Sequence, residues 1–179
     1  MVEFYYHDNK DTPADFTQRH NSGIPVSAPD LEALGVKYYY VEDVEQLNKI
    51  AEERKYKNRD QVSLSLDSFG GDLEAFDKKM KQFYEEHFHE DEEIRYVVEG
   101  EGYFDVRDKN DRWVRALLQP HDLLILPAGI YHRFTLSDEQ KYTKAIRLFK
   151  DEPKWEAINR KENRESSVRE SYVKLIAAA

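Results

Sequence analysis

The chain has 179 residues and a net charge of −9, with 36 acidic residues against 27 basic ones. This length suits one domain with its own core, and an acidic balance without a basic stripe makes nucleic acid and anionic membranes poor partners. The sequence contains no cysteine, which excludes disulfides, thiolate ligands and a cysteine nucleophile. Any metal would therefore be held by nitrogen and oxygen atoms.

The N-terminal segment shows neither an export signal nor a membrane span. Residues 1–6 lack a basic lead and a long apolar core, and no apolar run in the chain approaches ~20 residues. We therefore expect a protein of the cytoplasm. The basic cluster at residues 54–59 raises a nuclear address as an alternative location, but so short a run is more typical of a solvated helix end.

The first half of the chain is expected to alternate short strands with helices. Ser27 can cap one helix and Asp72 another. Apolar side chains in residues 43–55 and 72–84 recur at helical spacing, so each of these helices would bury one stripe. The expected elements are a strand at 4–6, a helix from Ser27 to about Gly35, a strand at 36–41, and helices at 43–55 and 72–84.

After Glu93 the sequence changes to short extended segments separated by turns. Turn residues recur every ~8–12 residues, the pattern of a β-sandwich or barrel. The six apolar segments span 94–98, 103–106, 113–118, 123–126, 131–136 and 144–149. Beyond Pro153 the chain turns polar and charged, and its last part is expected to be either a docked helix or a frayed tail.

His87, His89 and Glu93 form the strongest chemical signal in the sequence. On a strand, side chains two apart share a face, so both imidazoles can aim at one point while Phe88 faces away. The acidic run at 90–92 leaves room for a turn, after which the carboxylate of Glu93 can return to the same point. Imidazole with carboxylate is a common mononuclear metal set. The alternative is a solvated acidic loop beside two ordinary histidines, which this combination disfavours.

His132 is the expected fourth ligand. It follows Pro127-Ala128-Gly129, a rigid turn that opens the strand at 131–136, so its direction would be fixed by the turn. The other histidines lie in the N-terminal segment or in a polar turn, and we interpret them as structural or solvent-facing. They are His7, His20 and His121.

These motifs resemble the cupin superfamily, whose small β-barrels hold a metal with His-x-His, a Glu shortly after and a later His. The first motif reads His87-x-His89-x-x-x-Glu93 with Gly100 following, and the second reads Pro127-x-Gly129-x-x-His132. The chain departs from the usual pattern at Lys81, His121 and Leu136. These departures concern turn geometry and leave the ligands in place.

The cupin resemblance implies a mainly β (α+β) fold, a cupin or jelly-roll-like β-barrel with a few flanking helices. Residues 1–179 would then form a single domain. Its expected parts are N-terminal strands and helices (1–85), a metal-binding barrel core (86–150) and a C-terminal extension (151–179).

Longer blocks resemble the acireductone dioxygenase family of methionine salvage. The blocks are residues 87–96 and 127–136 with Ile146-Arg147-Leu148-Phe149, and the likeness covers roughly residues 1–160. Cupin motifs alone are shared by isomerases, oxygenases and storage proteins, so only these blocks select the family. The expected protein is a monomer.

That family implies one Fe(2+) or Ni(2+) per monomer, with His87, His89, Glu93 and His132 as ligands. The substrates would be O2 and an enediol, acireductone (1,2-dihydroxy-5-(methylthio)pent-1-en-3-one). With iron, family members yield formate and 2-oxo-4-methylthiobutanoate. With nickel they yield formate, carbon monoxide and 3-methylthiopropanoate.

Arg95 is expected to be the catalytic and substrate-binding cation. It shares a strand face with Glu93, so its guanidinium would point into the cavity as a counter-ion for an enediolate. The alternative is a structural ion pair with Glu90 or Glu92.

Phe134 and Arg147 are further substrate-contact candidates. Phe134 shares a face with His132 and would either wall the site or belong to the core. Arg147 alternates with Ile146 and Leu148, and the sequence does not decide which face lies inside.

Two other functions fit the cupin motifs. A sugar-phosphate isomerase would use the metal as a Lewis acid without O2, and a non-enzymatic cupin would bind a small ligand or a partner protein. A Ser-His-Asp hydrolase is disfavoured because the sequence has no Gly-x-Ser-x-Gly elbow.

Overall fold

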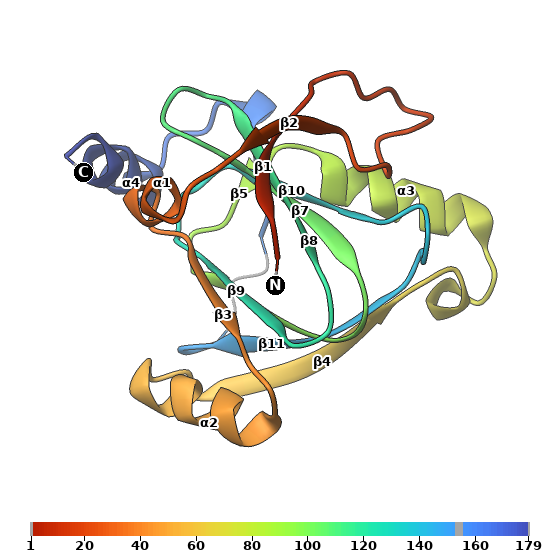
Figure 1. Cartoon of the computed structure of the whole chain (residues 1–179), viewed down its shortest axis with the longest axis horizontal. Helices are drawn as coiled ribbons and strands as arrows, with labels where there is room; N and C mark the ends of the chain where they lie inside the picture. Colours follow the sequence, from red (N-terminus) through yellow and green to blue (C-terminus); the bar gives the residue numbers. More distant parts are fainter. Residues whose placement is uncertain (1, 153–155, 179) are drawn as a thin grey trace.

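Two antiparallel β-sheets face each other in the computed structural model, which describes residues 2–152 and 156–178 (Figure 1). The seven-stranded sheet has the order β12-β5-β10-β7-β8-β1-β2, and the five-stranded sheet has the order β3-β9-β6-β11-β4. The predicted mainly β fold with a few helices is thereby confirmed.

The seven-stranded sheet joins strands from distant parts of the chain, since β1 pairs with β8 and β5 pairs with β12. Its strands are β1 (Phe4–His7), β2 (Asn21–Pro25), β5 (His87–Phe88), β7 (Gly102–Arg107), β8 (Trp113–Leu118), β10 (His132–Leu136) and β12 (Ile158–Asn159). The five-stranded sheet contains β3 (Lys37–Tyr40), β4 (Asn58–Leu64), β6 (Glu93–Gly100), β9 (Asp122–Leu126) and β11 (Thr143–Phe149). Early strands therefore complete both sheets, which supports our proposal that the whole chain is one domain.

In the described part of the chain, four α-helices and two short 3-10 turns flank the sheets. They are α1 (Ala28–Ala33), α2 (Val44–Glu53), η1 (Asp67–Phe69), α3 (Leu73–Tyr84), η2 (Arg160–Glu162) and α4 (Ser167–Ala177). Ser27 and Asp72 cap α1 and α3 as expected, accepting the backbone N–H groups of Asp30 and Ala75. None of the helices in the described ranges has the length and apolar character needed to cross a membrane.

Three strands were not predicted from the sequence. β2 is fully exposed, β12 has only two residues, and β4 is a polar edge strand that pairs with β11 alone. The basic cluster at 54–59 was interpreted as a helix end. Only its first residue fits this interpretation, because α2 ends at Glu53 with Arg54 as its C-cap, and β4 already begins at Asn58. Of the two expectations for the C-terminus, the docked helix is the one observed; residues 153–155 and 179 of the predicted extension lie outside the described residues.

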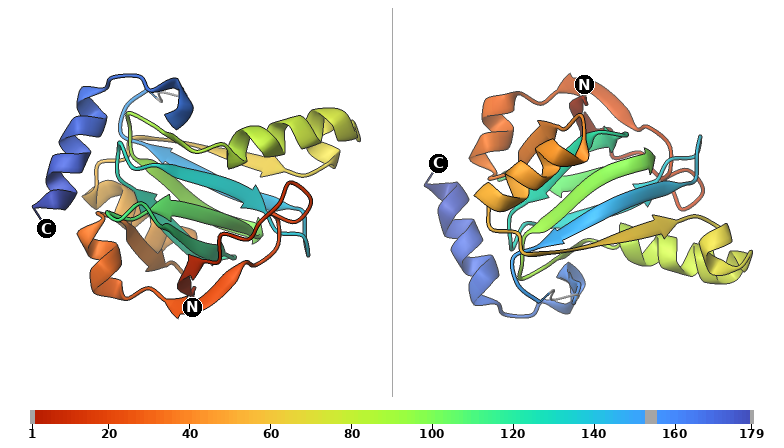
Figure 2. Two further views of the ribbon diagram at one scale, coloured as in Figure 1. Left: turned by 90° about the horizontal axis from the view of Figure 1, so that it is seen from above. Right: turned by 90° about the horizontal axis from the view of Figure 1, so that it is seen from below.

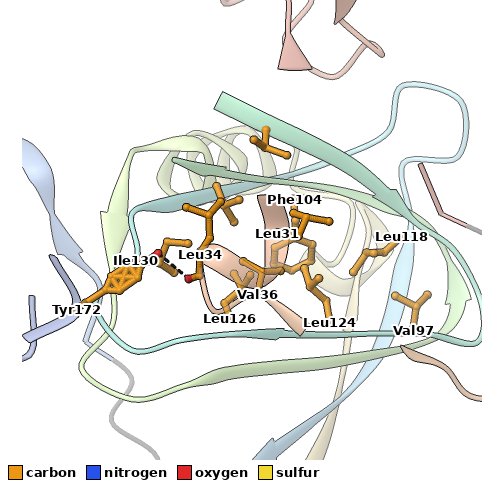
Figure 3. Packing of buried hydrophobic residues seen from close by; sticks show 12 residues of the cluster. Leu31, Leu34, Val36, Val97, Phe104, Leu118, Leu124, Leu126, Ile130 and Tyr172 are labelled. Carbon is orange, nitrogen blue, oxygen red and sulfur yellow. Dashed lines mark hydrogen bonds between the residues drawn. The ribbon is translucent and has the colours of Figure 1, made fainter. Parts of the chain in front are cut away.

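The apolar core lies between the sheets at the end near α1 and α4, while α3 lies on the other side of the barrel (Figures 1 and 3). Both sheets, α1 and α4 contribute side chains to it, and the hydroxyl of Tyr172 on α4 donates to the carbonyl of Leu34 at 2.8 Å. A second apolar cluster packs α2 on the outer face of the five-stranded sheet (Figure 2). Because side chains alternate along a strand, Ile94 and Leu148 pack outward there, and Arg95 and Arg147 point inward.

Candidate metal centre

Three imidazoles converge between the two sheets. His87 lies on β5, His89 directly follows that strand, and His132 begins β10, paired in register with His87. The ring centroids are 4.5 Å apart for His87 and His132, 5.0 Å for His87 and His89, and 5.1 Å for His89 and His132. One nitrogen from each ring lies within 4.8 Å of the other two. This spacing suits three nitrogens around one ion.

Backbone carbonyls fix the orientation of all three rings. The Nδ1 atoms of His87, His89 and His132 lie 2.6, 3.0 and 3.0 Å from the carbonyl oxygens of Glu85, Glu156 and Ile130 respectively. Since a carbonyl only accepts, each Nδ1 carries the proton and each Nε2 presents a lone pair to the shared point. This is the tautomer that a metal ligand requires.

Glu93 approaches the same point from the opposite sheet. Its Oε2 lies 2.6 Å from Nε2 of His132 and 3.4 Å from Nε2 of His89. Among the described residues, neither Oε2 of Glu93 nor Nε2 of His132 finds a hydrogen-bond partner, although both atoms are buried. A buried anionic oxygen beside a lone-pair nitrogen is repulsive unless a cation lies between them. The donor set, three nitrogens and one oxygen, fits a divalent transition metal.

The protonation states of the cluster also suit metal binding. Burial, reinforced by the neighbouring His132, lowers the pKa of His87 to about 3, and burial lowers the pKa of His89 as well. Burial by itself would raise the pKa of Glu93, but the charge of the neighbouring Arg95 holds that pKa well below its usual range. His87 and His89 are therefore neutral near neutral pH, and Glu93 is ionised.

The four side chains open into a cavity of about 850 Å³ between the sheets. Arg95 lines it, with Nη2 at 3.1 Å from Oε1 of Glu93, so its ion pair is with a candidate ligand and not with Glu90 or Glu92. Arg147 also faces this cavity, and its Nε donates to Asp60 at 2.8 Å. The inner face of β11 is thus the one that carries Arg147.

Aromatic rings form the apolar wall of the cavity. Phe134 packs against Phe104 with centroids 4.9 Å apart and edge-on against Phe83 at 6.0 Å. Phe134 therefore both lines the cavity and joins the core. Phe83 lies within the helix expected at 72–84, which was predicted only to bury one apolar stripe, and it lines the cavity as well. Its position four residues before His87, at the end of α3, is the sequence signal that could have placed it beside the site.

Gly102 on β7 makes room for this wall. A Cβ at Gly102 would clash with Cε2 of Phe134. We expect Gly102→Ala to lower the free energy of unfolding by about 1–3 kcal/mol, the usual cost of overpacking. Urea denaturation measures the loss. Phe134→Leu in the same chain should recover part of it, and a fully additive double variant would contradict this contact as the cause.

The remaining histidines lie outside the cavity lining. His7 is buried and accepts the N–H of Asn9 at Nδ1, 2.9 Å away, while His20 stacks on it and contacts Asp8 at 3.0 Å. His121 is exposed in a turn. One ligand atom from each of His7, Asp8 and His20 lies within 4.8 Å of the other two, so the interpretation of His7 and His20 as structural residues stays a prediction.

His7 should make stability depend on pH. Burial, together with the charge of Arg115, lowers its pKa to about 4, whereas the unfolded chain titrates near 6.5. Between these values only the unfolded state binds the proton, so its contribution to stability is complete above about pH 6.5 and is lost as the pH falls towards about 4. Urea denaturation across this range should show a weaker pH dependence for His7→Gln. An identical dependence in both proteins would argue against His7 as the source.

Comparisons with known proteins agree with this geometry. A sequence profile of the ARD/ARD' family matches residues 3–157. The acireductone dioxygenase of Candida albicans is 63% identical over 177 residues, covering 99% of each chain. The chain belongs to the acireductone dioxygenase family. The family resemblance predicted from residues 87–96 and 127–136 is therefore confirmed.

The chain is also similar to a yeast member of this family and to a solved bacterial structure. The acireductone dioxygenase of Saccharomyces cerevisiae is 52% identical over 179 residues, covering 98% of each chain. An acireductone dioxygenase from Bacillus anthracis, solved with a cadmium ion in its active centre, superposes with a TM-score of 0.66 at 23% identity, covering 88% of this chain and 98% of that one. The two structures therefore share the same fold over most of this chain.

Proposed function

We propose that the chain is a metal-dependent dioxygenase that cleaves acireductone with O2. The observation that carries this proposal is the convergence of His87, His89, Glu93 and His132 on one point, in a member of the acireductone dioxygenase family. In this proposal the four residues bind one Fe2+ or Ni2+ per chain. A bound divalent ion would supply two further coordination positions, which suit a chelating substrate and O2 chemistry.

Arg95 would bind and orient the substrate in this proposal. Its guanidinium lies beside Glu93, at the polar end of the cavity, and can hydrogen-bond an enediolate oxygen while neutralising its charge. Asp60 holds Arg147 in place through a two-pronged contact, so the guanidinium of Arg147 has a fixed position on the cavity wall. The aromatic wall around Phe134 would take the methylthio chain and keep water from the reacting carbons.

Charge on the cavity rim also suits an anionic substrate. Although the chain is acidic overall, the lining includes four lysines, of which Lys78, Lys79 and Lys81 lie on α3. Low-dielectric clefts of one sign focus the field and raise association rates. The rim would therefore draw the enediolate into the site.

Removing rim charge should slow substrate capture without changing the chemical step. We expect Lys78→Gln with Lys81→Gln to lower kcat/KM by up to about 10-fold at low salt, with kcat unchanged. Steady-state oxygen uptake at two ionic strengths measures this. Lys49→Gln with Lys174→Gln removes the same charge from other surfaces and should have little effect. Equal losses in the two double variants would show that only net charge matters.

The bound metal is proposed to select the products. We infer that Fe2+ directs the reaction to formate and 2-oxo-4-methylthiobutanoate, and Ni2+ to formate, carbon monoxide and 3-methylthiopropanoate, because the metal changes which substrate oxygens are chelated. Metal-free protein reloaded with each ion and supplied with the enediol tests this by oxygen uptake and product analysis. Identical products would refute metal selection. Turnover of the enediol without oxygen uptake would favour an isomerase. Absence of any turnover would favour a non-enzymatic cupin that binds a ligand.

We further propose that the protein acts as a cytoplasmic monomer in methionine salvage. The nuclear alternative rests on residues 54–59, and part of that cluster is committed to the fold. Arg54 donates to Tyr56 at 2.7 Å and lies 3.6 Å from Glu92, and Asn58 begins β4. Light scattering of the purified protein, and microscopy of a tagged copy, test these two proposals.

A further inference from the structure

One turn contacts two of the proposed metal ligands. Residues 127–131 join β9 to β10, and the N–H of Gly129 donates to the carbonyl of His89 at 3.0 Å. The carbonyl of Ile130, at the end of the same turn, accepts from Nδ1 of His132 at 3.0 Å. The position of this turn therefore sets the backbone of one ligand and the ring direction of another.

α4, far along the chain, packs closely on this turn. Gly129 has φ +89, and a Cβ there would lie 2.9 Å from Cβ of Tyr172 and 3.0 Å from the carbonyl oxygen of Val168. Only glycine permits both this backbone conformation and this approach. Tyr172 also ties α4 to the C-terminal end of α1 through the carbonyl of Leu34 (Figure 3).

Arg169 makes the polar contact between α4 and the turn. Its Nη1 donates to the carbonyl of Gly129 at 2.9 Å, and its guanidinium lies 4.0 Å from the ring centroid of Tyr131. Within residues 2–152 and 156–178, no carboxylate lies within salt-bridge distance of Arg169. A half-buried cation without an ion pair gains its interaction energy from the carbonyl and the ring, so it binds the turn itself.

We propose that Arg169 is a positioning residue for the metal centre. By holding the turn at Gly129 it keeps His89 and His132 in a metal-binding arrangement before an ion arrives. Without this contact, part of the metal-binding free energy would be used to order the turn. The proposal rests on the metal set proposed above, but not on the reaction performed there.

The test is the affinity of the metal-free full chain for Ni2+, measured by competition with a chromophoric chelator. Loss of an outer partner of a metal ligand typically weakens binding 10–100-fold. For Arg169→Met, which keeps the length of the side chain but removes its donors, we expect a dissociation constant about 10-fold higher. Arg169→Lys restores a charged donor and should recover part of the affinity. The visible spectrum of Co2+-loaded protein should shift in Arg169→Met as the ligand geometry changes.

Tyr172→Phe is the matched control. It removes the hydrogen bond of α4 to Leu34, so it should lower the melting temperature while leaving the Ni2+ dissociation constant and the Co2+ spectrum unchanged. Equal weakening of Ni2+ binding in both variants, or unchanged binding in Arg169→Met, would overturn the positioning role. His132→Ala separates the two proposals: if it binds Ni2+ as the original chain does, the metal set itself is wrong.

Discussion

Replacing His132 with alanine is expected to lower Ni2+ affinity by at least about 100-fold, since even an outer partner of a ligand contributes about 10–100-fold. The imidazole of His132 is buried, its Nε2 lies closest to Glu93, and no other described side chain bonds that nitrogen. The metal content of protein purified without added metal, measured by elemental analysis, should fall to background. The rate of oxygen uptake with the enediol should fall to background as well.

His121→Asn is the control for this substitution. His121 is exposed in a turn with φ +80, where asparagine is tolerated, and it does not line the cavity. The variant should retain metal and activity. If His132→Ala also retains a full equivalent of metal at unchanged affinity, the four-residue set proposed here is wrong.

The arrangement of these ligands could be anticipated because it follows from local rules. Strand alternation orients His87 and His89 together, and the turn before His132 fixes its direction. The sequence did not show that Glu93 belongs to the opposite sheet. β5 and β6 lie in different sheets, so the acidic run at 90–92 crosses the barrel to bring the carboxylate over the imidazoles.

Long-range partners of the charged residues could not be anticipated. Asp60 holds Arg147, but it lies on β4, whose polar sequence gave no strand signal. The alternating pattern predicted that Arg147 lies on the opposite face of its strand from Ile146 and Leu148. Which of the two faces points into the cavity is decided by α2, which covers the face that carries Ile146 and Leu148. Such pairings depend on tertiary packing, which propensity and periodicity do not encode.

The buried charges behind the metal centre illustrate the same limit. Asp105 and Arg115 lie in strands that were predicted from their apolar neighbours, and outward-facing charges on such strands are usually solvated. Here the irregular segment at 8–20 covers them, and Arg115 donates to the carbonyls of Gln18 at 2.6 Å and Phe16 at 3.3 Å. The sequence at 8–20 has no helical or strand periodicity, so it gave no indication that this segment would cover the sheet face that carries Asp105 and Arg115.

Substitution of Asp105 by asparagine should therefore be strongly destabilising. Its carboxylate is 1% exposed and accepts from Nε of Arg115 at 2.7 Å, Nη2 of Arg115 at 2.9 Å and Nε of Arg133 at 2.6 Å. Removing the one anion would leave two buried guanidinium groups facing each other. Breaking a buried pair in this way costs about 3–5 kcal/mol. Urea denaturation near neutral pH should show a loss of that size.

Glu99→Gln provides the comparison for an exposed pair. Glu99 is about half exposed and lies 3.8 Å from Lys144, so its replacement should cost less than about 1 kcal/mol. A loss for Asp105→Asn no larger than this would show that solvent or rearrangement compensates the two arginines. Because Arg133 adjoins His132 on β10, a large loss should be accompanied by weaker Ni2+ binding at temperatures well below unfolding. Stability and metal affinity would then depend on the same strand, with its charged side facing the buried network and its imidazole facing the metal centre.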